Sequence, residues 1–448
     1  MLLKDSKAAV IGAARSGVAA AKLVRKLGGI PFVSDFEKSI KLLESEKLLK
    51  ENKIEYELGN HSEKVFNVDL MIVSPGVPSD SKVIKRALEK GIKVISEVEL
   101  AFQNCKGKIV AITGTNGKTT TTSLCGHIFK TAGVKTYVAG NIGYAFSEVA
   151  LNANEGDYVV LEISSFQLDF IEKFKPNVAV ILNITPDHLN RYENKFENYI
   201  KSKLRIYSNQ DDKDFLVLNK DDEVLMKSLT AHNSKSFYFS NKEKLLDGCY
   251  VSDNHILFNE HGKLEFSFPL NELPIKGEHN AANAMAAVNA AKICDLDNEK
   301  IKEGLRTFKG VEHRLEFVRE LKGVKYINDS KATNVDSLWY ALRSFDEPIY
   351  LILGGQDKGN DYNKVKQLVI DKVKKIYAIG SSSDTVYNFF HSFVKVELKP
   401  TLEDVVISAS NEARENEIVL LSPACASFDM FDNYEHRGKV FKEAVNSL

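Results

Sequence analysis

Short apolar segments alternate with stretches of helical period along nearly the whole chain. Near the N-terminus, strands are expected at residues 8–11, 31–34, 69–74 and 93–96, with helices over 18–27 and 97–102. Glycines or polar residues follow most of these strands. Strands that alternate with helices form mostly parallel sheets, and such sheets bind ligands at the carboxyl ends of their strands. The pattern therefore predicts an α/β fold with its chemistry at strand ends.

The same alternation continues further along, with strands expected at 108–113, 136–139, 157–163, 177–183 and 216–222. Residues 232–275 differ, because polar and apolar positions alternate there in short pieces, which predicts a small antiparallel sheet. An alanine-rich helix begins near His279.

A last group of strands is expected at 324–328, 349–353 and 418–421, and each leads into a polar cluster. The helical segments between them indicate another mostly parallel sheet. Three polar clusters at one sheet edge predict a binding site there.

Composition adds a few limits. A length of 448 residues predicts about three domains, and 44% hydrophobic with 27% charged residues is typical of a globular protein. The formal net charge of −1 gives no reason to expect a nucleic-acid partner. The five cysteines are widely spaced and contain no C-x-x-C pair, which argues against a disulfide framework and a zinc site.

The N-terminal MLLKDSKAAV carries charged residues and is not expected to be a signal peptide. No apolar run approaches the ~20 residues that span a bilayer. We therefore expect a cytoplasmic protein with no membrane partner, and we expect a monomer.

The clearest chemical signal is KIVAITGTNGKTTTT at residues 108–122. A buried strand leads into the turn GTNG, and Lys118 with Thr119 opens a helix. Turn N–H groups and a helix N-terminus attract anions, so Lys118 would reach the outer phosphates of a nucleoside triphosphate and the Thr119 hydroxyl would bind Mg²⁺. The spacing G-x-x-G-K-T is shorter than the standard loop, which would need glycine at Ile112.

An earlier loop, GAARSG at residues 12–17, is followed by Asp35 at the end of the next strand. A glycine loop with an acid about twenty residues on is typical of dinucleotide-binding folds. Ala14 replaces the middle glycine, however, and its methyl group hinders the approach of a pyrophosphate. This argues against a nicotinamide cofactor and leaves a nucleotide-like ligand or a structural role.

Other strand ends offer metal ligands. Glu162 lies near the end of an apolar strand beside the phosphate loop, which favours a role at Mg²⁺, and His188 follows the next strand.

Residues 219–222 match the guanine motif N-K-x-D, but no D-x-x-G precedes them and the phosphate loop is too short for a GTPase. Cys425 lies between alanines with no evident histidine partner, so packing is expected.

Taken together, the motifs resemble the Mur ligases of peptidoglycan synthesis: GTNGKT, LEISSFQLD, NITPDHLNRY, KSKLRIY, GEHNAANA, HRLE, NDSKATN, GGQDKG and SPACASFDMFDNYEHRG. GTNGKT is shared with folylpolyglutamate synthases, whereas NDSKATN and SPACASFD are typical of members that add D-glutamate. The resemblance implies a UDP-sugar-binding Rossmann-like domain (1–96), a central P-loop ATPase domain (97–310) and a C-terminal Rossmann-like domain for the amino acid (311–448).

The resemblance also implies a reaction. ATP would phosphorylate the L-alanine carboxylate of UDP-N-acetylmuramoyl-L-alanine, and the amine of D-glutamate would displace phosphate from the acyl phosphate. Such chemistry depends on positioning and charge neutralisation more than on a protein nucleophile. It would serve cell-wall biogenesis, cell shape, the cell cycle and cell division.

Four groups of contacts follow from the resemblance. ATP binding is implied for Gly114, Thr115, Asn116, Gly117, Lys118, Thr119, Thr120, Asn280, Asn283, Arg314 and Asp329. Two Mg²⁺ ions are implied at Thr119, Glu162, His188 and Lys203. The UDP substrate would contact Ala14, Arg15, Asp35, Gly76 and Asn141, and D-glutamate would contact Thr333, Lys358, Ser427 and Phe428. Catalysis would involve Lys118, His188, Lys203 and Lys331. The chain departs from the most familiar members at 14–16, Phe428 and Tyr434.

Lys203, in the amphipathic segment KSKLRIY, has the pattern of a surface cation. The resemblance instead implies carbamylation by CO2, which would reverse its charge beside the second Mg²⁺. Two like unit charges ~4 Å apart repel by ~4 kcal/mol at an effective dielectric of ~20. An unmodified ammonium would therefore repel the metal.

Two alternatives remain. A ligase that adds L-lysine or diaminopimelate, or a folylpolyglutamate synthase, shares most of these features, but Lys358 and SPACASFD argue against both. A nucleotide-dependent switch or a dinucleotide-binding regulator belongs to a different class. Ala14, the short phosphate loop and the missing D-x-x-G argue against that class.

Overall fold

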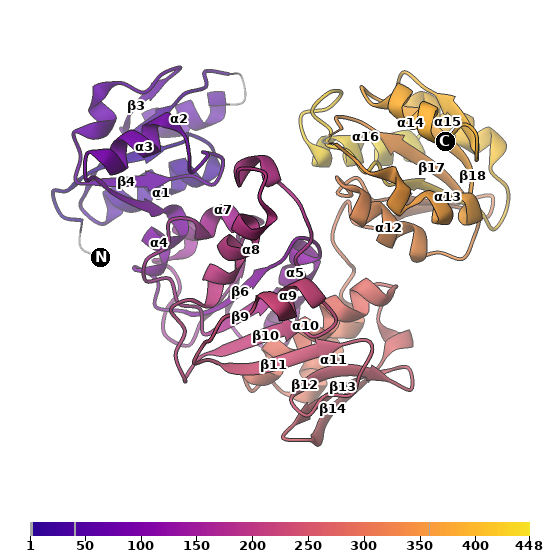
Figure 1. Ribbon diagram of the computed structural model, residues 1–448, viewed down its shortest axis with the longest axis horizontal. Coiled ribbons are helices and arrows are strands. Elements are labelled where there is room, and N and C mark those ends of the chain that lie inside the picture. The colour runs from indigo at the N-terminus through magenta and orange to yellow at the C-terminus, as the bar shows by residue number, and fades with distance from the viewer. Residues whose placement is uncertain (1–2, 40–41, 358) are drawn as a thin grey trace. The chain divides into compact units, whose positions relative to one another are not determined.

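The computed structural model describes residues 3–39, 42–357 and 359–448, and its strands form three sheets (Figure 1). The chain divides into two compact units. One comprises Met1–Leu273 with Ala281–Phe308, and the other comprises Pro274–Asn280 with Lys309–Leu448.

The first sheet has the order β3-β2-β1-β4-β5 and is parallel throughout. Since the order reverses at β1, the loops after β1 and β4 diverge there, which is where such sheets bind ligands. Its strands are β1 (Lys7–Ile11), β2 (Ile30–Asp35), β3 (Glu55–Leu58), β4 (Leu70–Val73) and β5 (Lys93–Ser96). Its helices are α1 (Arg15–Lys26), α2 (Leu43–Glu51), η2 (Glu63–Phe66) and α3 (Lys82–Glu89).

The second sheet has nine strands in the order β14-β13-β12-β11-β10-β9-β6-β8-β7. The strands are β6 (Lys108–Thr113), β7 (Thr136–Gly140), β8 (Tyr158–Glu162), β9 (Val178–Ile181), β10 (Phe215–Asn219), β11 (Lys235–Ser240), β12 (Gly248–Ser252), β13 (His255–Glu260) and β14 (Lys263–Pro269). The expected small antiparallel sheet at 232–275 is therefore not separate. β11 pairs parallel with β10 and extends the main sheet, and only β12, β13 and β14 pair antiparallel. The antiparallel prediction is therefore confirmed for β12, β13 and β14 and wrong for β11, because local alternation does not reveal which strands a given strand pairs with.

Helices connect these strands: α4 (Glu97–Phe102), α5 (Lys118–Thr131), α6 (Phe146–Val149), α7 (Ser165–Leu168), η3 (Leu189–Arg191), α8 (Phe196–Leu204), η4 (Arg205–Tyr207), α9 (Glu223–Ser228), η5 (Leu270–Glu272), α10 (Glu278–Ile293) and α11 (Asn298–Thr307). β6 and β8 are buried along almost their whole length. Strands covered on both faces need continuous apolar runs, which is the pattern of 108–113 and 157–163.

The third sheet has the order β15-β16-β20-β17-β18-β19, in which only the edge strand β15 pairs antiparallel. Its strands are β15 (Glu316–Leu321), β16 (Val324–Asn328), β17 (Ile349–Gly354), β18 (Val373–Ile379), β19 (Lys395–Leu398) and β20 (Ile418–Leu421). Its helices are α12 (Val335–Arg343), η6 (Tyr362–Lys364), α13 (Lys366–Lys372), α14 (Ser383–Phe390), α15 (Leu402–Glu412) and α16 (Tyr434–Asn446). Because β16, β20 and β17 are adjacent, the three polar clusters meet at one edge. No helix among the described residues has the length and hydropathy needed to cross a bilayer.

Candidate active site

The phosphate loop lies between β6 and α5. Gly117 caps α5 in the left-handed region (φ 85°), and a Cβ there would lie 2.4 Å from Oδ1 of Asn283. Both the left-handed backbone conformation and the lack of room for a Cβ therefore require glycine at this position. Asn283 Oδ1 also accepts a hydrogen bond from the Thr121 hydroxyl (3.1 Å). The Lys118 ammonium donates to the carbonyls of Gly114 (2.8 Å) and Thr115 (2.7 Å), so it lies folded over the loop.

Asn183 holds this loop and was not identified from the sequence. Its Oδ1 accepts hydrogen bonds from the backbone N–H groups of Thr115 (3.1 Å) and Asn116 (2.8 Å), and its Nδ2 donates to the Asn116 carbonyl (3.0 Å). The only signal for it was its place at the end of the segment NVAVILN.

Glu162 ends β8, which pairs with the strand that leads into the phosphate loop. Its side chain is 1% exposed, and Oε1 accepts a hydrogen bond from Nδ2 of Asn141 (2.8 Å). Its other oxygen, Oε2, has no hydrogen-bond partner among the described residues. A buried carboxylate oxygen without a donor is expensive unless a cation or ligand binds it. This chemistry fits a Mg²⁺ ligand.

Lys203 is buried, which contradicts the surface-cation pattern of its helix. The side chain is 1% exposed, its ammonium donates to the Gly114 carbonyl (2.7 Å), and it lies 4.7 Å from the Tyr199 ring centroid. Lys118 donates to the same carbonyl. Burial lowers the pKa of Lys203 well below its usual value, and the charge of Lys118 adds to this effect against the opposing charges of Asp187 and Glu162.

His188 lies in the loop after β9 with left-handed backbone (φ 51°). Its ring meets the ring of Phe166 edge-on at 5.2 Å, and Nε2 lies 3.7 Å from a carboxylate oxygen of Asp187. The side chain remains 42% exposed, which leaves an imidazole that solvent and ligands can reach.

In the first sheet, the side chain of Asp35 contacts the backbone of the loop at residues 12–17. Its Oδ2 accepts a hydrogen bond from the Ala13 N–H (2.6 Å), next to Ala14, the N-cap of α1. Arg15 donates to the carbonyls of Gly143 (2.7 Å) and Gly140 (3.3 Å), on either side of Asn141. A Cβ on Gly76 would meet nothing within 4 Å.

Asp329 ends β16 and is 1% exposed. Its oxygens accept hydrogen bonds from the Ser422 hydroxyl (2.9 Å) and the Leu315 N–H (3.2 Å). Burial raises the pKa of Asp329 to about 6, against the opposing charge of Arg314 and the hydrogen bond from Ser422. Asn280, another residue implied for ATP, donates through Nδ2 to the Lys276 carbonyl (2.8 Å).

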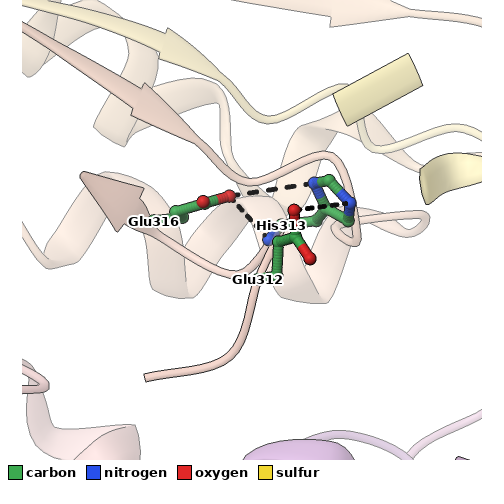
Figure 2. A group of neighbouring side chains, drawn as sticks. All are labelled: Glu312, His313 and Glu316. Atoms are coloured by element: carbon green, nitrogen blue, oxygen red, sulfur yellow. Dashed lines mark hydrogen bonds and ion pairs between the residues drawn. The ribbon is translucent and has the colours of Figure 1, made fainter. Parts of the chain in front are cut away.

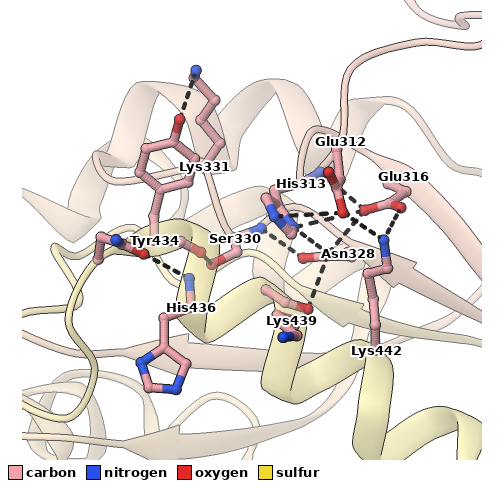
Figure 3. Close-up of polar contacts among 12 residues, drawn as sticks. Glu312, His313, Glu316, Asn328, Ser330, Lys331, Tyr434, His436, Lys439 and Lys442 are labelled. Atoms are coloured by element: carbon pink, nitrogen blue, oxygen red, sulfur yellow. Dashed lines mark hydrogen bonds and ion pairs between the residues drawn. The ribbon is translucent and has the colours of Figure 1, made fainter.

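The remaining implied residues are placed as follows. The Lys331 ammonium donates to the Tyr434 hydroxyl (3.1 Å), as Figure 3 shows. Ser427 is 2% exposed and Phe428 is 61% exposed in the loop after β20, and the Thr333 N–H donates to the Lys331 carbonyl (3.0 Å). Lys358 lies outside the described residues.

Arg437 joins two loops of the site region and was not identified from the sequence. It is 1% exposed and donates to the Ser330 hydroxyl (2.9 Å), the Ser330 carbonyl (2.7 Å) and the Cys425 carbonyl (3.1 Å). It thereby ties the loop after β16 to the loop after β20. Burial lowers the pKa of Arg437 to about 10. Its place in the motif DNYEHRG was the available signal.

Glu312, His313 and Glu316 have possible metal-ligand atoms within 4.8 Å of one another (Figure 2). We do not assign a metal there, because the Lys442 ammonium already bridges Glu312 (2.8 Å) and Glu316 (2.7 Å) (Figure 3). The His313 carbonyl accepts a hydrogen bond from the Lys331 N–H (3.0 Å). The cluster braces the loop that carries Lys331.

Comparison with known proteins decides the family. Three family models match: the MurD N-terminal domain over residues 7–83, the Mur ligase middle domain over 112–291, and the Mur ligase glutamate ligase domain over 313–425. The UDP-N-acetylmuramoylalanine–D-glutamate ligases of Salinibacter ruber and Chloroherpeton thalassium are 43% and 45% identical, over 100% of this chain and 99% of each relative. The chain belongs to the Mur ligase family. For this Mur ligase, the family explains why a phosphate loop and two Rossmann-like sheets occur in one chain.

Solved structures agree with the three-domain Mur ligase fold. UDP-N-acetylmuramate-alanine ligase from Thermotoga maritima is similar with a TM-score of 0.64 and 21% identity, covering 99% of both chains. The MurF ligase from Thermotoga maritima, solved in complex with ADP, has a TM-score of 0.59 and 14% identity, covering 99% of this Mur ligase and 96% of that chain. At these identities the likeness concerns the fold alone.

Proposed function

We propose that this Mur ligase uses ATP to join D-glutamate to the L-alanine carboxylate of UDP-N-acetylmuramoyl-L-alanine, in the synthesis of peptidoglycan precursors. The full-length similarity to ligases of that name supports the substrate pair. One observation in the site supports the chemistry. Glu162 ends the strand that pairs with the one leading into the phosphate loop, and its buried Oε2 accepts no hydrogen bond from any residue that the structure describes.

The phosphate loop would neutralise the outer phosphates of ATP. Lys118 now donates to two loop carbonyls, and in the complex its ammonium would exchange them for phosphate oxygens. The N-terminus of α5 adds N–H groups and a partial positive charge. We assign the remaining ATP contacts to Asn280, Asn283, Arg314 and Asp329. The product of this step is an acyl phosphate on the L-alanine carboxylate.

We assign two Mg²⁺ ions to Thr119, Glu162, His188 and a carbamylated Lys203. Bound Mg²⁺ supplies charge neutralisation for the phosphates. Carbamylation joins the Lys203 nitrogen to the carbon of CO2, and the ammonium loses two protons to solvent, which turns a positive side chain into a negative carbamate. The burial of Lys203 and the acceptor it shares with Lys118 support this proposal, since two ammonium groups on one carbonyl repel each other.

The substrates would bind at the sheet edges. We assign the UDP substrate to Ala14, Arg15, Asp35, Gly76 and Asn141 in a domain of residues 1–96, with ATP bound in a central domain of residues 97–310. D-glutamate is assigned to Thr333, Lys358, Ser427 and Phe428 in a domain of residues 311–448, with Lys331 near the reacting groups. We further propose that the protein acts as a cytoplasmic monomer.

An amino-acid panel tests this function. With UDP-N-acetylmuramoyl-L-alanine and Mg²⁺-ATP, D-glutamate should give product and phosphate, whereas L-lysine and diaminopimelate should give neither. Product from another amino acid would contradict the assignment. Phosphate release that needs neither substrate would instead favour the nucleotide-switch alternative.

The Lys358→Ala variant tests the amino-acid site, because a D-glutamate carboxylate would pair with its ammonium. The KM for D-glutamate should rise more than the KM for ATP. Equal shifts of the two KM values would contradict this role for Lys358.

A further inference from the structure

Arg191 links two loops that the proposed function assigns to different ligands. It ends η3, shortly after His188, and its guanidinium donates to the carbonyls of Pro75 (3.0 Å) and Val77 (2.8 Å). These two carbonyls flank Gly76, in the loop after β4. A guanidinium presents a planar fork of donors that holds two carbonyls in a fixed geometry, whereas a lysine ammonium is a compact charge on a flexible stem.

The same guanidinium packs on an aromatic ring of the metal-site region. Its central carbon lies 4.0 Å from the Phe166 ring centroid. Phe166 also meets the ring of His188 edge-on (5.2 Å) and stacks on Tyr192 (6.0 Å). Phe166 belongs to α7, which begins shortly after Glu162. A displacement of Arg191 would therefore change the packing of the ring that supports His188.

A further contact extends this link toward Lys203. The Ser202 hydroxyl lies within hydrogen-bonding distance of the Ser165 carbonyl (2.9 Å) and the Asp169 carboxylate (2.7 Å), on either side of Phe166. Helix α8, which carries Lys203, is thus tied to the segment that holds Phe166. The contacts are continuous from Gly76's loop, through Arg191 and Phe166, to the residues assigned to the metal.

We propose that Arg191 is a positioning residue that couples the UDP-substrate loop to the Mg²⁺-nucleotide site. This inference rests on the proposed function. The contacts of Arg191 with the Pro75 and Val77 carbonyls depend on the conformation of the loop at residues 74–78. A UDP substrate that binds this loop conformation therefore also favours the positions of His188 and Phe166 seen in the structure. Binding of the UDP substrate then tightens binding of Mg²⁺-nucleotide, and the coupling is reciprocal.

Calorimetry of the full chain tests this coupling without amino acid. The Kd of Mg²⁺-ADP is measured with and without UDP-N-acetylmuramoyl-L-alanine, and the ratio of the two values is the coupling factor. We expect a factor of about five or more in the parent protein, at the lower end of allosteric couplings. Arg191→Met, which keeps an apolar stem on Phe166, should bring the factor to within about twofold of one. Arg191→Lys should give an intermediate factor, because one ammonium replaces the fork.

Arg205→Met is the matched control. Arg205 also donates to two carbonyls, those of Leu168 (2.7 Å) and Ile171 (2.9 Å), but both belong to the segment that follows β8 and neither to the loop after β4. This variant should lose a similar amount of stability and keep the coupling factor. If Arg191 merely stabilised the fold, both substitutions would lower the Tm and neither would change the coupling factor.

An unchanged coupling factor in Arg191→Met, or the absence of coupling in the parent protein, would overturn the proposal. If Arg191→Met does not fold, Phe166→Leu interrupts the same link at its next member and should also lower the factor. Failure of the D-glutamate assay with intact coupling would refute the proposed function alone, because the coupling measurement needs no ligation.

Discussion

Two buried glutamates in the same unit should respond in opposite ways to the same substitution. Glu162 is 1% exposed, and its Oε2 has no hydrogen-bond partner among the described residues. Glu99 is 0% exposed, and its carboxylate accepts hydrogen bonds from the backbone N–H groups of residues 172–174 (2.9–3.1 Å) and from Gln103 Nε2 (2.6 Å). The first arrangement suits a ligand site and the second a structural site.

The contacts set the magnitudes. In Glu99→Gln, an amide NH2 group replaces one acceptor oxygen. At Oε2 the N–H groups of Glu172 and Phe174 lose their partner, and at Oε1 Gln103 Nε2 loses its partner, so one or two donors are left unpaired. Each buried donor left unpaired costs about 1–3 kcal/mol, so the free energy of unfolding should fall by about 2–5 kcal/mol. In Glu162→Gln, the remaining oxygen still accepts from Asn141, and the charge of a buried partnerless oxygen is removed. The free energy of unfolding should then stay the same or rise by about 1–2 kcal/mol.

The assay is urea unfolding of both variants in Mg²⁺-free buffer, combined with turnover at saturating Mg²⁺. Glu162→Gln should lower kcat by about 10²–10³-fold, as on loss of one preorganised charge stabiliser. Glu99→Gln should retain turnover at temperatures where it is folded. Equal destabilisation of the two variants in the absence of Mg²⁺ would refute the reasoning, because Glu162 would then be a structural residue.

Three further predictions address other parts of the site. Gly117→Ala should destabilise the protein by about 1–3 kcal/mol and weaken ATP binding, because φ is 85° and the new Cβ meets Asn283; unchanged ATP affinity would contradict the close approach. Burial raises the pKa of Asp329 to about 6, so the folded state favours its neutral form. The resulting stabilisation is complete at pH values below the unfolded pKa and is lost as pH rises through about 6. Asp329→Asn should therefore gain about 2 kcal/mol relative to the parent between pH 4 and pH 7, and a flat difference across this range would contradict the raised pKa. Removal of CO2 and bicarbonate from the buffer should lower turnover, and added bicarbonate should restore it. Normal turnover of Lys203→Ala both with and without bicarbonate would refute carbamylation.

Local pattern was sufficient for the elements that carry the strongest chemistry. The strand of residues 108–113 and the helix 97–102 occur with the expected bounds, and the phosphate loop lies between strand and helix as expected. Apolar runs, glycine turns and helix starts depend on neighbours along the chain, so the sequence carries them directly. The family resemblance, confirmed by the full-length relatives, rests on the same short motifs.

Partners distant in sequence were decided only by the tertiary structure. Asn183 reaches the phosphate loop and Arg437 joins the loops after β16 and β20, and neither contact has a local pattern. The pairing of β11 with β10, and hence the single nine-stranded sheet, likewise depends on residues far apart in sequence.

The burial of Lys203 shows most clearly what the local sequence pattern cannot predict. Its helix has the alternation of an exposed surface, yet the side chain lies beneath the phosphate loop and shares a carbonyl with Lys118. The sequence by itself determined a strand, a glycine turn and a helix start at residues 108–119, from which we predict phosphate binding. Only the tertiary structure decided which charges face this loop, because electrostatic environment depends on distance in space and on the exclusion of water.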